Sequence, residues 1–271
     1  MSDECIHGFE NGMCASCFPK PLPEAPVAVA VAPRPRSAAG GSATRTRATP
    51  AVKRVAGSAA YADVSEQRVY HVTHVSNLAG ILSSGAISAG LAPIVDISPA
   101  GAREERDSVD IPGIVSMPEL AGARLADFVP FFASPNALVW QSIRAQEAHP
   151  RVSRDILGTD AADFVLLVST IKQLVELDGA LIVTDGAAEA ATTRFGVGRT
   201  DAETLLRKLR ASSDPDAILG AEVFVHGSVP LESVSLIGVA HDKARAVVRQ
   251  VLEDTDAEAK VAVYPPWFAA E

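Results

Sequence analysis

Cysteine and histidine residues occur together near the start of the chain, at a spacing that suits a metal ion. Cys5-x-His7 is followed by Cys14-x-x-Cys17, and three thiolates with one imidazole can form a closed tetrahedral zinc site. No other cysteine occurs in the sequence. We therefore expect a structural zinc ion on Cys5, His7, Cys14 and Cys17, because a segment this short needs a metal in order to fold. Reduced thiols without a metal are the alternative.

One carboxylate, Glu222, interrupts an apolar run from Ala221 to Val225 that is typical of a strand. Such a side chain either faces solvent on one side of the strand or is held inside the protein for chemistry. His71 and Thr73 occupy alternate positions of another β-prone run. They therefore project from one face and offer ring nitrogens and a hydroxyl to a ligand.

Charged residues form a short cluster from Arg103 to Arg106, before Ile111-Pro112. A solvated charge cluster is the common interpretation, whereas an arginine that binds phosphate or positions a substrate is the functional one. The sequence contains no Gly-x-Gly-x-x-Gly motif, no Walker phosphate loop and no His-Glu-x-x-His. Use of a dinucleotide would therefore require a different fold.

The residues around His71 predict a strand followed by a helix. Val69 to Thr73 is β-prone, Ser76 can cap the helix, and Gly85 can end it. The apolar residues on one face of this helix are Leu78, Ile81 and Leu82. Residues 91–126 show little periodicity and many charges, which favours a long functional loop.

Residues 128–132 form another short apolar stretch. Further apolar runs predict strands at 164–169, 180–184, 222–226, 234–239 and 260–264. Helices are predicted at 201–210, with Asp201 as its cap, and at 242–252. Strands outnumber helices and follow one another late in the chain. This order favours an α+β fold over a doubly wound parallel sheet.

Five segments resemble the successive motifs of the DarT-type DNA ADP-ribosyltransferases. They are Tyr70 to Leu82, Glu105-Arg106, Asp127 to Phe132, Thr184-Asp185 with Arg194-Phe195, and Ala221 to Val225. Their order and approximate spacing agree over residues 69 to about 268. The resemblance implies an ADP-ribosyltransferase-like fold in which two small sheets surround a cleft that binds NAD as a co-substrate.

The same resemblance implies roles for individual residues. Arg106 and Glu222 would be the catalytic pair, and Glu222 would engage the nicotinamide ribose. A fixed carboxylate there stabilises the cation that develops as the glycosidic bond breaks. The NAD pocket would include His71, Val72, Thr73, Asn77, Gly80 and Arg106. The loop that meets the acceptor would present Thr192, Arg194 and Phe195, although Phe195 in the core and Arg194 bonded to a carboxylate is an equally good structural interpretation.

Composition divides the chain into a basic beginning and an acidic body. Seven basic and four acidic side chains give residues 1–60 a net charge of +3, and the remaining 17 basic and 29 acidic ones give residues 61–271 a net charge of −12. We expect a zinc-binding segment at 1–20, a disordered basic linker rich in Pro and Ala at 21–66, and a catalytic domain at 67–271. The linker arginines could add a salt-sensitive contact to nucleic acid.

The sequence thus predicts an enzyme that transfers ADP-ribose from NAD to a base in single-stranded DNA. Resemblance to the toxin family implies a macrodomain ADP-ribosylglycohydrolase as a possible antitoxin. The alternatives are a transferase that acts on RNA or protein, an NAD glycohydrolase, and a catalytically silent zinc-containing module that binds nucleic acid. No apolar stretch approaches the length of a membrane span, and the start of the chain lacks the pattern of a secretory signal, so we expect a cytoplasmic protein.

Overall fold

The computed structural model describes residues 63–177, 180–253, 255 and 259–270. In these residues the strands are β1 (Arg68–His74), β2 (Ala86–Ser88), β3 (Phe128–Phe132), β4 (Phe164–Thr170), β5 (Leu181–Thr184), β6 (Phe195–Val197), β7 (Glu222–His226), β8 (Ser228–Pro230), β9 (Leu236–Val239) and β10 (Val261–Val263). The α-helices are α1 (Val75–Ser84), α2 (Ala102–Asp107), α3 (Leu138–Ala145), α4 (Ile171–Val175), α5 (Gly198–Arg210) and α6 (Asp242–Glu253). The α+β class predicted from the sequence is confirmed.

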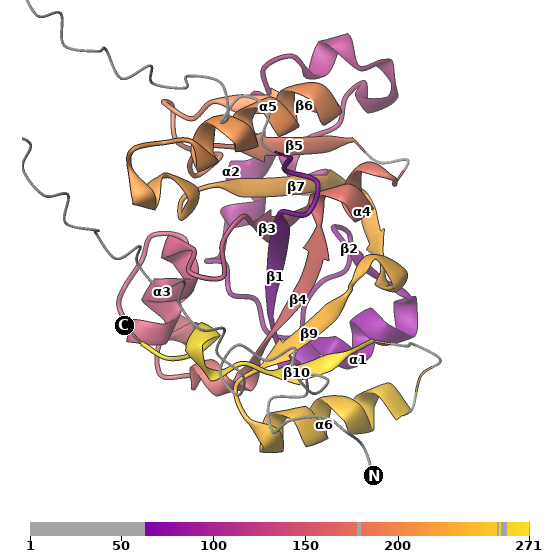
Figure 1. Cartoon of the computed structure of the whole chain (residues 1–271), viewed down its shortest axis with the longest axis vertical. Helices are drawn as coiled ribbons and strands as arrows, with labels where there is room; N and C mark the ends of the chain where they lie inside the picture. Colours follow the sequence, from indigo (N-terminus) through magenta and orange to yellow (C-terminus); the bar gives the residue numbers. More distant parts are fainter. Residues whose placement is uncertain (1–62, 178–179, 254, 256–258, 271) are drawn as a thin grey trace, which may run out of the picture. The chain divides into compact units, whose positions relative to one another are not determined.

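Eight strands form one mixed sheet in the order β10-β9-β4-β1-β3-β7-β5-β6, and β2 pairs with β8 in a small separate sheet. All neighbours in the large sheet are antiparallel except β9 and β10. Figure 1 shows β5 and β7 running across the direction of β1 and β4. The large sheet is therefore strongly twisted between its two halves.

The halves meet where β1 pairs with β3. This pairing has a single register position, Tyr70 opposite Phe132, whereas β1 pairs with β4 along seven positions and β3 with β7 along five. The expectation of two small sheets around a cleft is therefore wrong, because β1 and β3 join the halves into one sheet. Beyond that position the two strands separate, and side chains from both can line a cavity.

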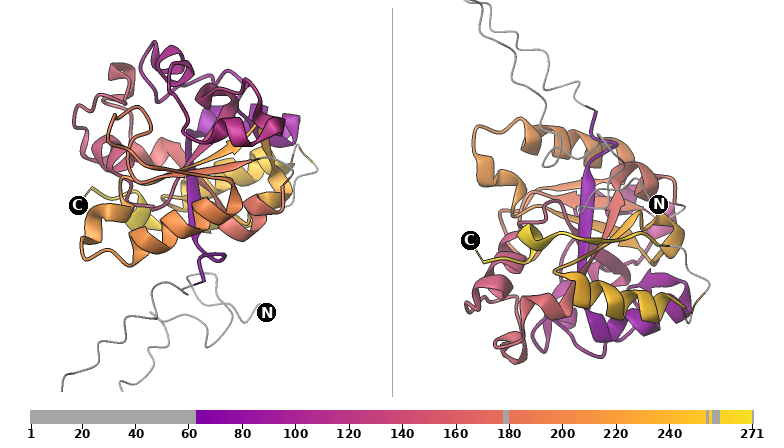
Figure 2. Two further views of the ribbon diagram at one scale, coloured as in Figure 1. Left: turned by 90° about the horizontal axis from the view of Figure 1, so that it is seen from above. Right: turned by 60° about the horizontal axis from the view of Figure 1, so that its bottom comes forward.

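Apolar side chains pack on both faces of the large sheet. One cluster joins the sheet to α1, α5 and α6, with Leu78, Leu206 and Val248 among its members, and α1 lies beside α6 in this layer (Figures 1 and 2). A second cluster joins the other face to α3 through Trp140. The indole Nε1 of Trp140 donates a 2.6 Å hydrogen bond to the Trp267 carbonyl, which fixes the segment after β10 on this face.

Several predicted boundaries differ from the structure. The Nδ1 atom of His74, and not the Ser76 hydroxyl, caps α1 by accepting from the Ser76 N–H. Helix α5 begins at Gly198, three residues before Asp201, because it follows β6 without a loop. The predicted loop at 91–126 contains α2 and short 3-10 helices. Val64, in the predicted linker, is fully buried in the core of the domain.

None of the helices in the described ranges combines the length and the apolar composition that crossing a bilayer requires.

Candidate active site

A cavity of about 540 Å³ opens where β1 and β3 separate, within the size range of small-molecule sites. Its walls include residues of β1, α1, the segment 87–99, α2, β3 and the start of β7, together with Val139, Pro150, Arg151 and Glu189. Each residue that the sequence placed in the NAD pocket or the catalytic pair lines this cavity: His71, Val72, Thr73, Asn77, Gly80, Arg106 and Glu222. Residues separated by 151 positions in the sequence therefore meet at one site.

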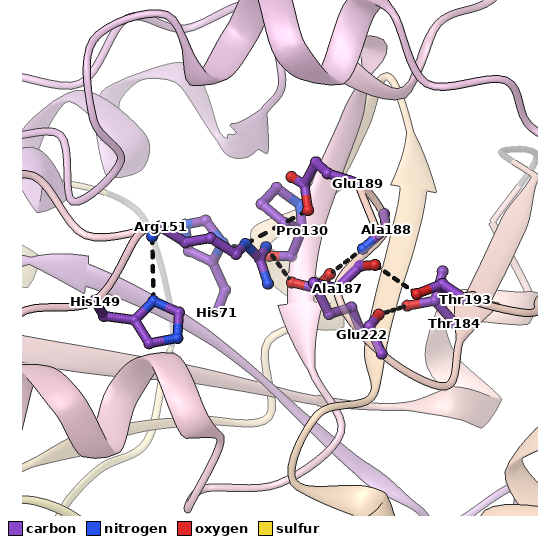
Figure 3. A network of polar contacts seen from close by, with 11 residues as sticks. His71, Pro130, His149, Arg151, Thr184, Ala187, Ala188, Glu189, Thr193 and Glu222 are labelled. Carbon is purple, nitrogen blue, oxygen red and sulfur yellow. Dashed lines mark hydrogen bonds and ion pairs between the residues drawn. The ribbon is translucent and has the colours of Figure 1, made fainter. Parts of the chain in front are cut away.

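Glu222 is the first residue of β7 and only 1% exposed. Its Oε1 accepts a 2.5 Å hydrogen bond from Nη2 of Arg151, and its Oε2 accepts a 3.1 Å hydrogen bond from the Ala188 N–H (Figure 3). Burial raises the pKa of Glu222, although the Arg151 guanidinium opposes the rise. The interpretation of Glu222 as a solvent-facing strand residue is therefore wrong: the carboxylate is buried and held at both oxygens.

Arg151 is a cavity residue that the sequence did not single out. It lies between α3 and β4 and bridges two carboxylates, since its Nε is also 3.5 Å from Oε2 of Glu189. Burial disfavours the charged form, but the two glutamates more than compensate and raise the pKa of Arg151. The surrounding segment has no periodicity, and its partner Glu222 is 71 residues away, so no sequence signal pointed to the pair.

His71 connects the separated strands. Its Nδ1 lies 2.9 Å from the Pro130 carbonyl, and because a carbonyl can only accept, Nδ1 carries the proton in this contact. Burial lowers the pKa of His71 below its ordinary 6.5, which favours the neutral ring. In that tautomer Nε2 has a lone pair with which to accept a hydrogen bond from a ligand.

Asn77 braces the wall of the cavity through all of its side-chain polar atoms. Its Nδ2 donates to the Thr73 hydroxyl oxygen at 3.0 Å and to the Val95 carbonyl at 2.8 Å. Its Oδ1 accepts from the N–H groups of Ile94 and Val95 at 2.7 and 2.9 Å. The side chain therefore ties the segment after β2 to α1, and the Thr73 hydroxyl retains its own proton for a further hydrogen bond.

Arg106 lies in the last turn of α2. Its Nε is buried and has no hydrogen-bond partner among the described residues. Arg103 on the same helix differs, because it is exposed and its Nη1 donates to the Ala89 carbonyl at 3.1 Å. A buried guanidinium nitrogen without an acceptor is costly, so a bound group that supplies an oxygen would relieve the cost at Arg106.

A second cavity of about 570 Å³ shares Glu105 and Glu189 with the first. Phe195 and Thr193 line it. Arg194 is instead paired with Asp185, with Nε 2.5 Å from Oδ2. The structural interpretation of Arg194 as bonded to a carboxylate is therefore confirmed. Phe195 is half-buried and packs against a buried apolar cluster, and it also lines the cavity wall. Thr192 is exposed and lies outside both linings.

The loop between β5 and β6 is held by its own hydrogen bonds. The Thr184 hydroxyl donates to the Gly186 carbonyl at 2.7 Å, and the Thr193 hydroxyl donates to the Ala187 carbonyl at 2.6 Å (Figure 3). These contacts place the Ala188 N–H against Glu222. The loop therefore forms a wall of the second cavity and contacts the carboxylate of the first.

The predicted zinc ligands Cys5, His7, Cys14 and Cys17 lie outside the described residues. Within the described part of the chain, no group of three or more His, Cys, Asp or Glu side chains is arranged to hold a metal ion.

The chain is similar in sequence and in fold to known proteins. A family model described as "ssDNA thymidine ADP-ribosyltransferase, DarT" matches residues 70–269. Among solved structures, DarT from Thermus sp. 2.9 in complex with ADP-ribosylated ssDNA is 20% identical, with a TM-score of 0.59, and the match covers 75% of this chain and 96% of that chain. The same protein in complex with NAD⁺ is 21% identical, with a TM-score of 0.58 and coverage of 75% and 98%.

A third structure, Thermosipho africanus DarTG in complex with ADP-ribose, is 16% identical, with a TM-score of 0.53, and the match covers 74% of this chain and 51% of that one. No curated protein sequence that was compared matches the chain. At sequence identities of 16–21%, the similarity to these solved structures shows the fold alone. Because the family model spans well over half of the sequence, the chain belongs to the DarT family of ssDNA thymidine ADP-ribosyltransferases.

Proposed function

We propose that this chain transfers ADP-ribose from NAD to a thymidine base of single-stranded DNA and releases nicotinamide, with Glu222 and Arg106 as the catalytic pair. The proposal is supported by the contents of one cavity. The buried Glu222 carboxylate and the buried Arg106 Nε, which has no hydrogen-bond partner among the described residues, line it together with His71 and Thr73. Chemistry that separates charge needs such fixed groups of opposite sign.

NAD would bind where β1 and β3 separate. The His71 Nε2 can accept a hydrogen bond, the Thr73 hydroxyl can donate one, and Val72 adds an apolar side chain to the wall. These residues would hold the nicotinamide end. Asn77 would act through the wall that it braces. A Cβ at Gly80 would meet no atom within 4 Å, so this residue leaves open space beside the cavity that it lines.

The reaction breaks the bond between C1′ of the ribose and the nicotinamide nitrogen, and the electron pair leaves with nicotinamide. The ribose then carries oxocarbenium-like positive charge. Glu222 stabilises this charge and accepts a hydrogen bond from a ribose hydroxyl, for which a carboxylate with two of about four acceptor positions occupied has capacity.

Arg106 would meet the substrates with its guanidinium. Its high pKa makes the group a poor proton acceptor, so its role is to donate hydrogen bonds. The acceptors would be pyrophosphate oxygens of NAD, or the carbonyl oxygens of a base that gains negative charge as it loses a proton. Both assignments satisfy the Nε that has no acceptor among the described residues.

The acceptor base would enter the second cavity. Phe195 offers a ring on which a base can stack, and Thr193 and Glu105 offer polar atoms at the wall. Thr192 and Arg194 would contact the strand next to that base, with Arg194 held by Asp185. Since the two cavities share Glu105 and Glu189, the base would lie beside the ribose that it attacks.

Thymine chemistry favours a single strand as the acceptor. In a thymidine, N1 is bonded to deoxyribose and the exocyclic substituents are two oxygens and a methyl carbon, so N3 is the nitrogen that can attack. The new bond joins N3 to C1′, and the N3 proton leaves to solvent or to a protein group. In a duplex N3 is engaged in base pairing and is inaccessible unless the base is extruded.

The predicted N-terminal zinc site remains part of the proposal. Cys5, His7, Cys14 and Cys17 would hold a structural zinc ion that supplies folding energy and no reaction step. Metal analysis of the purified full chain tests the site. One equivalent of zinc that is lost in Cys14→Ser supports it, and substoichiometric zinc that is unchanged in Cys14→Ser opposes it.

We also propose that the activity is toxic to bacteria and that a macrodomain ADP-ribosylglycohydrolase reverses it, in line with the DarT toxin family. Expression of the wild-type chain should stop growth, expression of Glu222→Ala should not, and a co-expressed macrodomain hydrolase should restore growth. Normal growth with soluble, active wild-type protein would count against this role.

The acceptor class can be tested with labelled NAD and four separate pools: single-stranded DNA, duplex DNA, RNA and protein. Label should enter single-stranded DNA and enter duplex DNA poorly. Label confined to RNA or protein would show another acceptor, and release of free ADP-ribose without a labelled polymer would show a glycohydrolase.

A further inference from the structure

Arg151 bridges the two parts of the site that the proposed function requires. Its Nη2 is 2.5 Å from Glu222 Oε1, and its Nε is 3.5 Å from Glu189 Oε2. Glu222 is contributed by β7, whereas Glu189 belongs to the loop between β5 and β6 that lines the second cavity. One guanidinium therefore contacts both the carboxylate of the NAD cavity and the wall of the proposed acceptor cavity (Figure 3).

A second contact closes this arrangement. The Ala188 N–H, next to Glu189 in the same loop, donates to the other oxygen of Glu222. The carboxylate is thus fixed between a side-chain donor on one oxygen and a backbone donor on the other. Both donors lie on segments that are distant from β7 in the sequence, so the orientation of Glu222 depends on them and not on its own strand alone.

We infer that Arg151 is a positioning residue that orients the Glu222 carboxylate and ties it to the loop that meets the acceptor. The inference rests on the proposed role of Glu222 as the carboxylate that faces the NAD ribose. Arginine suits this task because its planar guanidinium presents several donors in a fixed geometry and can contact two carboxylates at once.

The electrostatic surroundings give the inference a second measurable consequence. Arg151 opposes the burial that raises the pKa of Glu222, whereas Glu189 adds to the rise. Burial and the charge of Arg151 lower the pKa of the neighbouring His149. The backbone N–H of Arg151 donates a 3.1 Å hydrogen bond to His149 Nδ1. The other titratable side chains that line the cavity are His71, Asp96, Arg103, Glu105 and Arg106.

Removal of Arg151 should therefore change both the rate and its pH dependence. In Arg151→Ala we expect kcat for transfer to a single-stranded oligonucleotide to fall on the order of 10- to 100-fold, as small misplacements of catalytic groups do. KM for NAD should stay within about threefold, because the residue acts through Glu222. The acidic limb of kcat should move to higher pH, since Glu222 must be ionised and loses the cation that favours ionisation.

Three further variants separate the possible roles. Arg151→Lys retains the charge and should keep the acidic limb near its wild-type position while kcat stays reduced. Glu189→Gln removes the like charge and should move the limb to lower pH, opposite to Arg151→Ala. Arg154→Ala is the matched control, because this exposed arginine lies three residues away and should leave kcat, KM and the pH profile unchanged.

Thermal unfolding shows whether each variant is folded. If Arg151→Ala is unfolded, the kinetics of Arg151→Lys test the positioning role. A variant whose KM for NAD rises while kcat and the acidic limb stay unchanged would make Arg151 an NAD-binding residue and overturn the inference, as would wild-type kinetics in both Arg151 variants. Absence of transfer by the wild-type chain would instead count against the proposed function itself.

Discussion

At the scale of single residues, the environment of Glu222 decides what this site can do. The carboxylate is almost fully buried, yet one guanidinium and one backbone N–H hold it. A charged group kept inside the protein in this way costs stability unless it is paired. Its presence at a cavity, in a strand that is otherwise apolar, supports the catalytic role that we propose for it.

Glu222→Gln should lower kcat for ADP-ribose transfer about 100-fold or more, because the charge is needed mainly in the transition state, and NAD affinity should stay within about tenfold. Steady-state kinetics and direct titration of NAD binding measure the two quantities. Glu232→Gln, an exposed glutamate, is the control and should match the wild type. Comparable turnover in Glu222→Gln would end the catalytic assignment.

The pH dependence of the wild-type enzyme follows from the same group. Burial raises the pKa of Glu222 above the ordinary 4.5, and the proposed mechanism requires the ionised form. Activity should therefore be present above the raised pKa and be lost as the pH falls through it, with an acidic limb of kcat/KM above pH 4.5. A limb at or below 4.5 would show that Glu222 is not the group that titrates.

Arg106 and Arg103 form a natural pair for comparison on one helix. Arg106→Ala should reduce kcat/KM by about 100-fold or more, since its buried Nε has no acceptor in the described structure and is available to substrate. Arg103→Ala should reduce it by less than about fivefold, because Arg103 is exposed and bonded to a backbone carbonyl. A larger loss of kcat/KM in Arg103→Ala than in Arg106→Ala would show that Arg103 is the catalytic arginine.

At the scale of elements, β6 and α5 pack so closely that only glycine fits between them. A Cβ on Gly196 would lie 2.6 Å from the Asp201 carbonyl oxygen and 2.8 Å from its carbon, and these are backbone atoms that cannot rotate away. Because β6 follows the loop that contacts Glu222, this packing also supports the site.

Gly196→Ala should lower the free energy of unfolding by about 1–3 kcal/mol, the usual cost of overpacking, as measured by denaturant titration. Gly80→Ala is the control on stability. It lies inside α1 with open space around its Cβ, so it should stabilise the fold by about 0.5–1 kcal/mol. Equal stability of Gly196→Ala and the wild type would show that β6 and α5 can move apart.

Much of the element order was predictable from the sequence. The strand from Glu222 to His226 has the bounds that its apolar run indicated, and Gly85 ends α1 as the sequence predicted. The features that the sequence did not predict depend on contacts between distant segments. The single β1–β3 register position that joins the two halves of the sheet has no local signature. The same is true of Arg151, whose partners are fixed only by the folded chain.

At the scale of the whole molecule, every residue that lines the two cavities lies in the part matched by the family model. The basic residues of 1–60 stand outside it. Deletion of residues 1–60 should therefore leave kcat at saturating DNA within about twofold. KM for DNA should rise and become less dependent on salt, because lost phosphate contacts reduce the salt slope. An inactive but folded truncation would show that the first segment belongs to the site.

We propose above all that this chain joins ADP-ribose to a thymidine of single-stranded DNA through Glu222. The wild type and Glu222→Gln are each incubated with NAD and with one of two single-stranded oligonucleotides. The oligonucleotides differ only in a single thymidine, which is replaced by deoxycytidine in the second. The products are detected by mass spectrometry. We expect one ADP-ribose adduct, on the thymidine oligonucleotide and with the wild type alone. Equal modification of both oligonucleotides, or an adduct formed as fast by Glu222→Gln, would contradict it.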